Sequence, residues 1–288
     1  MSFNARLIRS ACLLAGLAAL TACGTTYNLP TASEAHEQAA ASMFAEERDP
    51  GTARAGRKLS GSAAVRQFNQ VVARVEPAAE KFCRQETADR PNFDCDIHVV
   101  IDDQARDRNA FQTYTKDGRV LVAFTKPMIA DARNPDELAF VMGHEMGHHI
   151  GQHINKQKQQ AVAGALIMGA ITAYGQAAAT NANPYRYSGG DQQEMERNMA
   201  MGMGAGKMAY SQTYELESDV IGTAITRMAG YDPVKGARFF ARAEAVHTAD
   251  GNLSFWGTHP PDEKRLATVL ATMDSIEAGG GIERKSYD

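Results

Sequence analysis

The chain has 288 residues, which is enough for one large domain or two modest ones. Hydrophobic residues make up 44% of it and charged residues 22%, a composition typical of a globular protein and not of a disordered one. The formal net charge of −4 gives no reason to expect nucleic acid as a partner. Functional information therefore has to come from local patterns.

The N-terminus has the order of features found in a bacterial lipoprotein signal peptide, over residues 1–22. Two arginines precede a short apolar run, which leads into small residues and a cysteine, as in a secretory signal. The run is shorter than the roughly 20 apolar residues that a membrane-spanning helix needs. Residues 20–23 resemble the lipobox, so we expect a lipid on Cys23; the alternative is an ordinary signal with a chance cysteine. The resemblance to sorted lipoproteins, with Gly24 in place of an aspartate after the cysteine, favours the periplasmic face of the outer membrane.

The remaining cysteines agree with export. Cys12 leaves with the signal peptide and Cys23 is used by the lipid, which leaves Cys83 and Cys95. An oxidising periplasm would allow these two to form a disulfide, which is the pairing we predict. Closing the short loop between them would stabilise the fold by about 3 kcal/mol in the chain-entropy model. The alternatives are two free thiols or a metal site.

The first half of the chain is predicted to place a helix before a small sheet. Residues 23–58 show no sustained apolar period, so we predict a tether or loosely docked N-terminal arm. Apolar residues then recur at helical spacing from about 63 to 83. Runs of β-branched and alternating residues predict strands over 97–101, 110–114 and 119–124, the last two joined by a hairpin turn.

The second half is predicted to be helical. Asn134 followed by Pro135 and two acids is a strong helix start, and we predict a helix from Pro135 through at least His153. Residues 161–179 are rich in alanine and glycine and nearly uncharged. They are weakly hydrophobic for a transmembrane helix, so we favour a packed helix whose small residues allow close approach. The remaining predictions are a loop over 180–192, a helix over 211–228, helices starting at Pro233 and at Pro260-Pro261, and a flexible tail over 278–288.

The motif that carries chemistry runs from His144 to His148, with the sequence His-Glu-Met-Gly-His. Histidines at positions i and i+4 share one face of a helix, so both rings can bind a single cation. Glu145 projects about 100° around the helix from His144, where it can take a proton from metal-bound water. The alternative is a structural pair of histidines. The position of the motif inside a capped helix, in an exported chain, favours the metal.

A catalytic zinc usually has three protein ligands and an open position for water. The metzincin pattern requires a third histidine where this chain has Ile154, so that class is excluded. In the other known arrangement, the third zinc ligand is a carboxylate from a later helix. Glu215 and Asp219 share a helical face, so one could bind zinc while the other supports a ligand. Glu217 points elsewhere and is predicted to be a solvated charge.

Several segments together resemble the gluzincin family of zinc metallopeptidases that includes HtpX and the type I CAAX prenyl proteases, and most of all its soluble periplasmic lipoprotein branch. The resemblance covers roughly residues 109–270. The segments that carry it are Asn109-Ala110-Phe111, Asp136-Glu137-Leu138-Ala139, Gly143 to His148, Glu215 to Asp219, Ala229 to Pro233, and Thr258 to Pro261 with Arg265.

The resemblance implies one Zn²⁺ per chain, held by His144, His148 and Glu215. It implies Glu145 as the general base and Asp219 as a carboxylate that supports a zinc ligand, with His259 and Arg265 beside the site. We predict an α+β, mostly helical, zincin-like metallopeptidase domain over residues 59–277, with a small sheet that contains an antiparallel hairpin.

Some roles stay open at this point. His259 could donate to an oxyanion, act as a fourth zinc ligand that gates the enzyme, or cap the last helix, because two prolines follow it. Arg265 could anchor the substrate or an acid near the site, or be a surface charge. His149 and His153 are predicted to be structural. The methionines between 195 and 208 could suggest copper, but their helical spacing favours packing.

The function predicted from the sequence is that of a membrane-tethered zinc metalloendopeptidase. Its partners would be polypeptides, which the resemblance implies are misfolded or misassembled envelope proteins, and the membrane through the lipid on Cys23. An extended substrate is predicted to add a strand along the edge formed by residues 119–124. The rival hypothesis is a chaperone-like assembly factor of the outer membrane with a gated or structural zinc site. An inert metal store has little support.

Overall fold

The computed structural model describes residues 24–49, 59, 61–182, 191–208, 211–251 and 253–285. The signal peptide predicted over residues 1–22 and the lipid predicted on Cys23 lie outside these residues. The chain divides into two compact units. We call Thr26–Gly151 with Glu215–Asp288 the α/β unit, and Met1–Thr25 with Gln152–Tyr214 the hairpin unit. The single domain predicted over residues 59–277 thus takes in parts of both.

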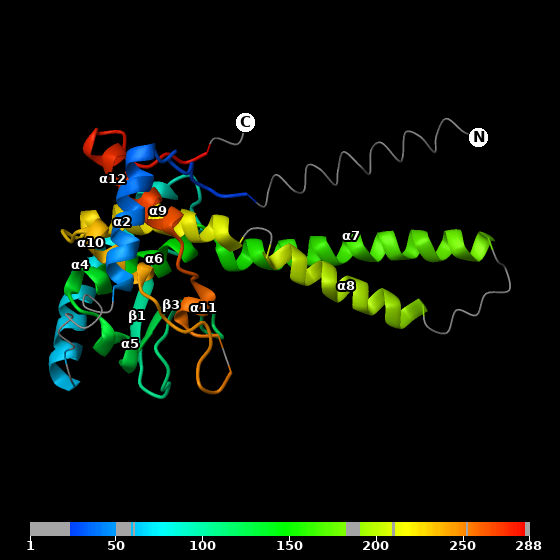
Figure 1. Ribbon diagram of the computed structural model, residues 1–288, viewed down its shortest axis with the longest axis horizontal. Coiled ribbons are helices and arrows are strands. Elements are labelled where there is room, and N and C mark those ends of the chain that lie inside the picture. The colour runs from blue at the N-terminus through cyan, green and yellow to red at the C-terminus, as the bar shows by residue number, and fades with distance from the viewer. Residues whose placement is uncertain are drawn as a thin grey trace. The chain divides into compact units, whose positions relative to one another are not determined.

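The described residues are mostly helical with one small sheet, so the predicted α+β class is confirmed (Figure 1). In chain order the elements are α2 (Glu34–Arg48), α4 (Gly61–Glu86), β1 (Ile97–Asp102), β2 (Ala110–Tyr114), β3 (Val120–Thr125), α5 (Lys126–Asp131), α6 (Pro135–Ile150), α7 (His153–Ala182), α8 (Asp191–Met208), α9 (Ser211–Met228), α10 (Pro233–Ala237), the 3₁₀ helix η1 (Arg238–Ala241), α11 (Phe255–Thr258) and α12 (Glu263–Glu277).

The three strands form a mixed sheet in the order β1-β3-β2, with β1 parallel and β2 antiparallel to β3. The predicted hairpin is present, and Gly118 at its turn has a φ of +89°, a conformation that favours glycine. Because β3 is central, its backbone pairs with a strand on each side. The prediction that a substrate adds along residues 119–124 is therefore wrong. The hairpin strand that lies at an edge of the sheet is β2.

The motif helix α6 begins as predicted, since the side chain of Asn134 accepts a hydrogen bond of 3.0 Å from the backbone N–H of Glu137. Its predicted continuation through His153 is wrong. The backbone N–H of Gly151 closes the last turn on the carbonyl of Gly147 at 2.8 Å, and Gln152 then has a φ of 58°. This left-handed residue interrupts the helix, and a separate helix starts after it.

Glycines bring α6 and α9 close together in the α/β unit. A Cβ atom added to Gly222 would lie 2.9 Å from the backbone nitrogen of His144. One added to Gly147 would lie 3.0 Å from the carbonyl oxygen of Ser218. Both distances are shorter than ordinary contacts, so only glycine permits this spacing of the two helices. The carboxylates of α9 can therefore reach the histidines of α6.

The N-terminal arm is not the loose tether that the sequence predicts for residues 24–48. Tyr27 is almost fully buried, and α2 packs against α12 while burying Phe44 and Ala40. The predicted flexible tail is also docked as far as residue 285, since Arg284 forms a β-bridge with Tyr27 and pairs with Asp89. Few apolar residues take part in these contacts, so the sequence shows no apolar period that would predict them.

The predicted disulfide between Cys83 and Cys95 is present and joins the end of α4 to the segment before β1. Replacing both cysteines by serine is expected to lower the free energy of unfolding by about 3 kcal/mol, because the unfolded chain regains the freedom of the closed loop. Urea unfolding of the double variant beside the oxidised parent measures this. An unchanged midpoint and slope would mean that the crosslink does not stabilise the fold.

The hairpin unit contains α7 and α8, which run side by side (Figure 1). The small residues of α7 do allow close approach, as predicted: a Cβ on Gly169 would lie 3.2 Å from the side chain of Met199, and Asn198 donates a 3.0 Å hydrogen bond to Thr172. Within the described residues of the hairpin unit, the other side of α7 is not packed. The span His153–Ala178 is long and apolar enough to cross a membrane, with a mean hydropathy of 1.4 over an 18-residue window, yet only 22% of that window is buried.

Candidate metal centre

Four side chains of the α/β unit converge at one point: His144 and His148 from α6, Glu215 from α9, and His259 directly after α11. One donor atom from each lies within 4.8 Å of all the others. The Nε2 atoms of the two α6 histidines are 3.1 Å apart. All but His148 are buried. The sequence predicted three of these residues as ligands and left a fourth-ligand role open for His259, whose ring the fold brings to the other three.

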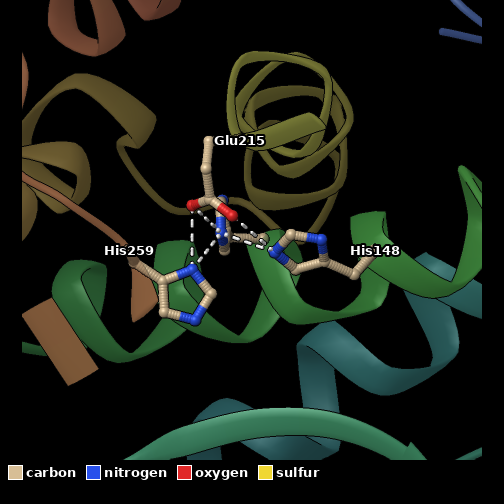
Figure 2. Close-up of side chains that lie close together, drawn as sticks. His148, Glu215 and His259 are labelled. Atoms are coloured by element: carbon tan, nitrogen blue, oxygen red, sulfur yellow. Dashed lines mark hydrogen bonds and ion pairs between the residues drawn. The ribbon is translucent and has the colours of Figure 1, made fainter. Parts of the chain in front are cut away.

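Glu215 lies between the histidine rings. Its carboxylate oxygens are 3.4 Å from Nε2 of His144, 3.4 Å from Nε2 of His148 and 2.8 Å from Nδ1 of His259. Figure 2 shows the carboxylate pointing toward the rings of His148 and His259. Burial alone would raise the pKa of Glu215, but the surrounding histidines hold it well below its ordinary value. The cluster therefore contains an anion.

Asp219 contacts His144, and Arg265 in turn contacts Asp219. Asp219 lies one helical turn after Glu215, and its Oδ1 is 2.9 Å from Nδ1 of His144. Arg265 donates two hydrogen bonds of 2.7 Å to the two oxygens of Asp219. Burial raises the pKa of Asp219, but Arg265 outweighs it and lowers the pKa. An ionised Asp219 accepts the Nδ1 proton of His144, which turns the Nε2 lone pair toward the cluster.

His144 is basic in this setting. Burial lowers its pKa, but the hydrogen bonds to Asp219 and Glu215 outweigh burial and raise the pKa to about 9. A cation in the cluster competes with that proton, because metal ligation uses the same Nε2 lone pair.

Glu145 lies beside the four donors and is not one of them. Its Oε2 accepts a 3.1 Å hydrogen bond from the backbone N–H of Gln112 in β2. Its Oε1 has no hydrogen-bond partner among the residues that the structure describes and lies 3.3 Å from Nε2 of His259. The side chain is almost fully buried, and this burial raises the pKa of Glu145. A buried carboxylate of raised pKa with one free oxygen is suited to taking up a proton.

One protein-family model matches the sequence that forms this cluster. The model of peptidase family M48 aligns with residues 66–273, most of the chain. The chain belongs to peptidase family M48. The expected membership among gluzincin metallopeptidases is thereby confirmed, and the activity is that of a peptidase acting on polypeptides. No curated protein matched the sequence in a separate comparison.

The donors of this M48 peptidase fit the zinc on which the family depends. Two imidazoles and one carboxylate form one of the usual ligand sets of a catalytic zinc. The three converge on one point, and Asp219 fixes the orientation of His144. His259 brings a fourth donor to the position that such a site normally leaves to water or substrate.

Two open questions about residues near the cluster are decided by the fold. His259 does not cap the last helix: Asp262 caps α12 by accepting from the backbone N–H of Lys264, and His259 follows α11 with its Nδ1 among the metal donors. Arg265 is not a surface charge, since it is almost fully buried beside Asp219.

The two histidines predicted to be structural, His149 and His153, have packing contacts, and neither belongs to the metal cluster. His149 lies 2.6 Å from the backbone oxygen of Asp94 and 3.2 Å from the hydroxyl of Tyr114. His153 stacks on Tyr214 in the hairpin unit, with 4.5 Å between ring centroids.

The prediction that Glu217 is a solvated charge is wrong. Glu217 is fully buried and accepts hydrogen bonds from the backbone N–H groups of Thr26 and Tyr27, the latter at 2.7 Å. The sequence has no local signal for this contact, because its partners are backbone groups about 190 residues away. Glu217 thus attaches the N-terminal segment to α9, two positions from Glu215.

Replacing Glu217 by alanine is expected to lower the free energy of unfolding by about 2–3 kcal/mol, because two backbone donors then lose a charged acceptor. The N-terminal segment should also become more accessible to protease, seen as faster cleavage near residues 24–32. The matched control is Glu277→Ala at the exposed end of α12, expected to change stability by less than about 0.5 kcal/mol. Equal stabilities of the two variants would contradict the anchoring role.

Proposed function

We propose that this M48 peptidase is a zinc metalloendopeptidase whose zinc ligands are His144, His148 and Glu215. The observation that carries the proposal is the convergence of these donors on one point with Glu145 beside them. Endopeptidase action agrees with a sheet edge, β2, that leads to Glu145 and can take an extended chain.

Zinc, when bound, would polarise the scissile carbonyl and make water a better nucleophile. Glu145 would take the proton of the attacking water on Oε1, the oxygen with no hydrogen-bond partner, and later donate it to the leaving amine. Gln112 holds the other oxygen of Glu145 in place through its backbone N–H. Asp219 orients the ring of His144, and the positive charge of Arg265 balances the negative charge of Asp219.

His259 is proposed to act in two positions. With Nδ1 among the donors, it fills the place that water needs and holds the enzyme inactive. Rotated away, the ring can donate to the oxyanion that forms during peptide attack. This fourth donor is also the observation that favours the second candidate function, an outer-membrane assembly factor that binds proteins and keeps its zinc gated.

We further propose a lipid anchor on Cys23 and a location on the periplasmic face of the outer membrane. The support is the lipobox-like sequence and a disulfide between Cys83 and Cys95 that suits an oxidising compartment. The substrates proposed for this location are misfolded or misassembled envelope proteins.

The deciding experiment is zinc analysis and casein cleavage with the chain from residue 24 onward, purified without chelators. One zinc per chain is expected, with cleavage that stops on treatment with a chelator and returns when zinc is added back. Protein that carries no zinc, or that cleaves casein equally well after chelation, would contradict the proposal. Zinc without cleavage would support the gated candidate, and His259→Ala should then restore activity.

A further inference from the structure

The outer side of α7 is an apolar surface that nothing covers within the described residues of the hairpin unit. Five large side chains on this helix are each at least 50% exposed: Val162, Leu166, Ile167, Ile171 and Tyr174. At about 100° per residue they fall on one half of the helix circumference. Gly169 and Thr172, which contact α8, and the buried Ala165 fall on the other half.

The charge distribution favours lipid as the partner of this face. No Asp, Glu, Lys or Arg occurs from Gln159 to Ala182, and an 18-residue window of the helix reaches a mean hydropathy of 1.4, which is apolar enough for a membrane segment. The hydroxyl of Thr172 is already satisfied, since it donates to the carbonyl of Met168 at 2.8 Å and accepts from Asn198. The only other polar side chain between Val162 and Gly175 is that of Tyr174.

A protein partner fits this face less well. Protein interfaces carry about one hydrogen bond per 100–200 Å² and a polar rim. On the exposed face between Val162 and Tyr174, the only side-chain hydrogen-bonding group is the hydroxyl of Tyr174. A tyrosine at the end of an apolar stripe is typical of the boundary between lipid and water, where the ring is buried and the hydroxyl stays wet.

The charged residues of α8 limit how deeply the hairpin can enter a bilayer. Glu194, Glu196 and Arg197 lie within about one turn of Asn198, which bonds to Thr172 in the middle of α7. All three are exposed. A hairpin that crossed the bilayer would take these charges into the hydrocarbon, at high cost. A hairpin that lies along the surface, with α7 toward the lipid, keeps them in water.

We propose that the exposed face of α7 inserts into the interfacial region of a phospholipid bilayer, with the helix lying along the membrane surface. This contact is separate from the lipid proposed on Cys23 and does not depend on peptidase activity. Insertion of one apolar helical face gives reversible binding, which orients the hairpin unit on the membrane.

The test is flotation of the chain from residue 24 onward with vesicles of phosphatidylethanolamine and phosphatidylglycerol. This chain lacks Cys23, so binding cannot come from a lipid anchor. The parent is expected to float with the vesicles. The variant Leu166→Glu with Ile171→Glu is expected to lose roughly tenfold or more of the vesicle-bound fraction, because two large aliphatic side chains no longer enter the lipid.

The matched control places the same two charges on exposed positions of α8, as Gln193→Glu with Ala200→Glu, and should float like the parent. Both variants change exposed positions, so circular dichroism and casein cleavage should match the parent. Three results would overturn the proposal: a parent that does not float, an equal loss in both variants, or a parent dimer in lipid-free sedimentation that the α7 variant abolishes. The last result would assign the face to a second copy of the chain.

Discussion

Glu145→Gln is expected to reduce kcat/KM for peptide cleavage by roughly 10²–10⁴-fold while zinc content stays at that of the parent. Glutamine has the same shape and can still accept the hydrogen bond from the backbone N–H of Gln112. It cannot take a proton from water at pH 7. The four donors of the cluster do not include Glu145, so the metal should be retained. Steady-state kinetics on a fluorogenic peptide and metal analysis of the same preparation measure both quantities.

The control for this prediction is Glu277→Gln, which changes an exposed carboxylate on α12 in the same way and should leave kcat/KM unchanged. If Glu145→Gln cleaved peptides at the parental rate, the proton would have to be taken by another group, of which His259 is the nearest titratable one. If the variant lost its zinc, Glu145 would belong to the ligand set, and its role as a base would have to be abandoned.

Glu215→Gln is expected to weaken zinc binding by more than about 100-fold and to abolish cleavage at limiting zinc. The reason is that the anion of the cluster disappears, leaving imidazoles and an amide, which bind zinc poorly. Asp219→Asn should have the smaller effect, about 10–100-fold on zinc affinity, which is the usual range for a carboxylate that orients a ligand. Competition with a coloured zinc chelator measures both affinities.

The ranking of these two variants is the informative result, because Glu215 and Asp219 lie one turn apart on the same face of α9 and were equal candidates on spacing alone. A larger loss in Asp219→Asn would reverse the roles assigned to them. Circular dichroism has to accompany the measurement, since Asp219→Asn also weakens the buried pair with Arg265. A variant that loses zinc but keeps its helical signal reports on the site and not on folding.

The site has more acidic and basic groups than zinc binding needs. Arg265 contacts Asp219 through two hydrogen bonds and places Nη1 3.4 Å from Oε2 of Glu215. One buried cation thus stabilises two buried anions, one a proposed ligand and one the partner of a ligand. Such a network keeps its geometry before the metal arrives, because a broken pair would leave an uncompensated charge in the interior.

Much of this protein could be predicted from the sequence because its signals are local. The cap at Asn134, the spacing of His144 and His148, and the periodicity of Ser211–Met228 each depend on neighbours within a turn or two. Such patterns can be recognised in the sequence whatever the arrangement of the rest of the chain. They predicted the strands, the start of the motif helix and the carboxylate helix, together with the choice of Glu215 and Asp219 as candidates.

Only the tertiary structure decided which groups meet over long distances. That β3 is central, that Glu217 is buried on the backbone of Thr26, and that His259 joins the metal donors are all results of packing. The exposure of one side of α7 was also decided by the fold, because an alanine- and glycine-rich sequence has the same pattern whether the helix is covered on one side or on both. Spacing determines the face of a helix on which a residue lies, and the fold determines what that face contacts.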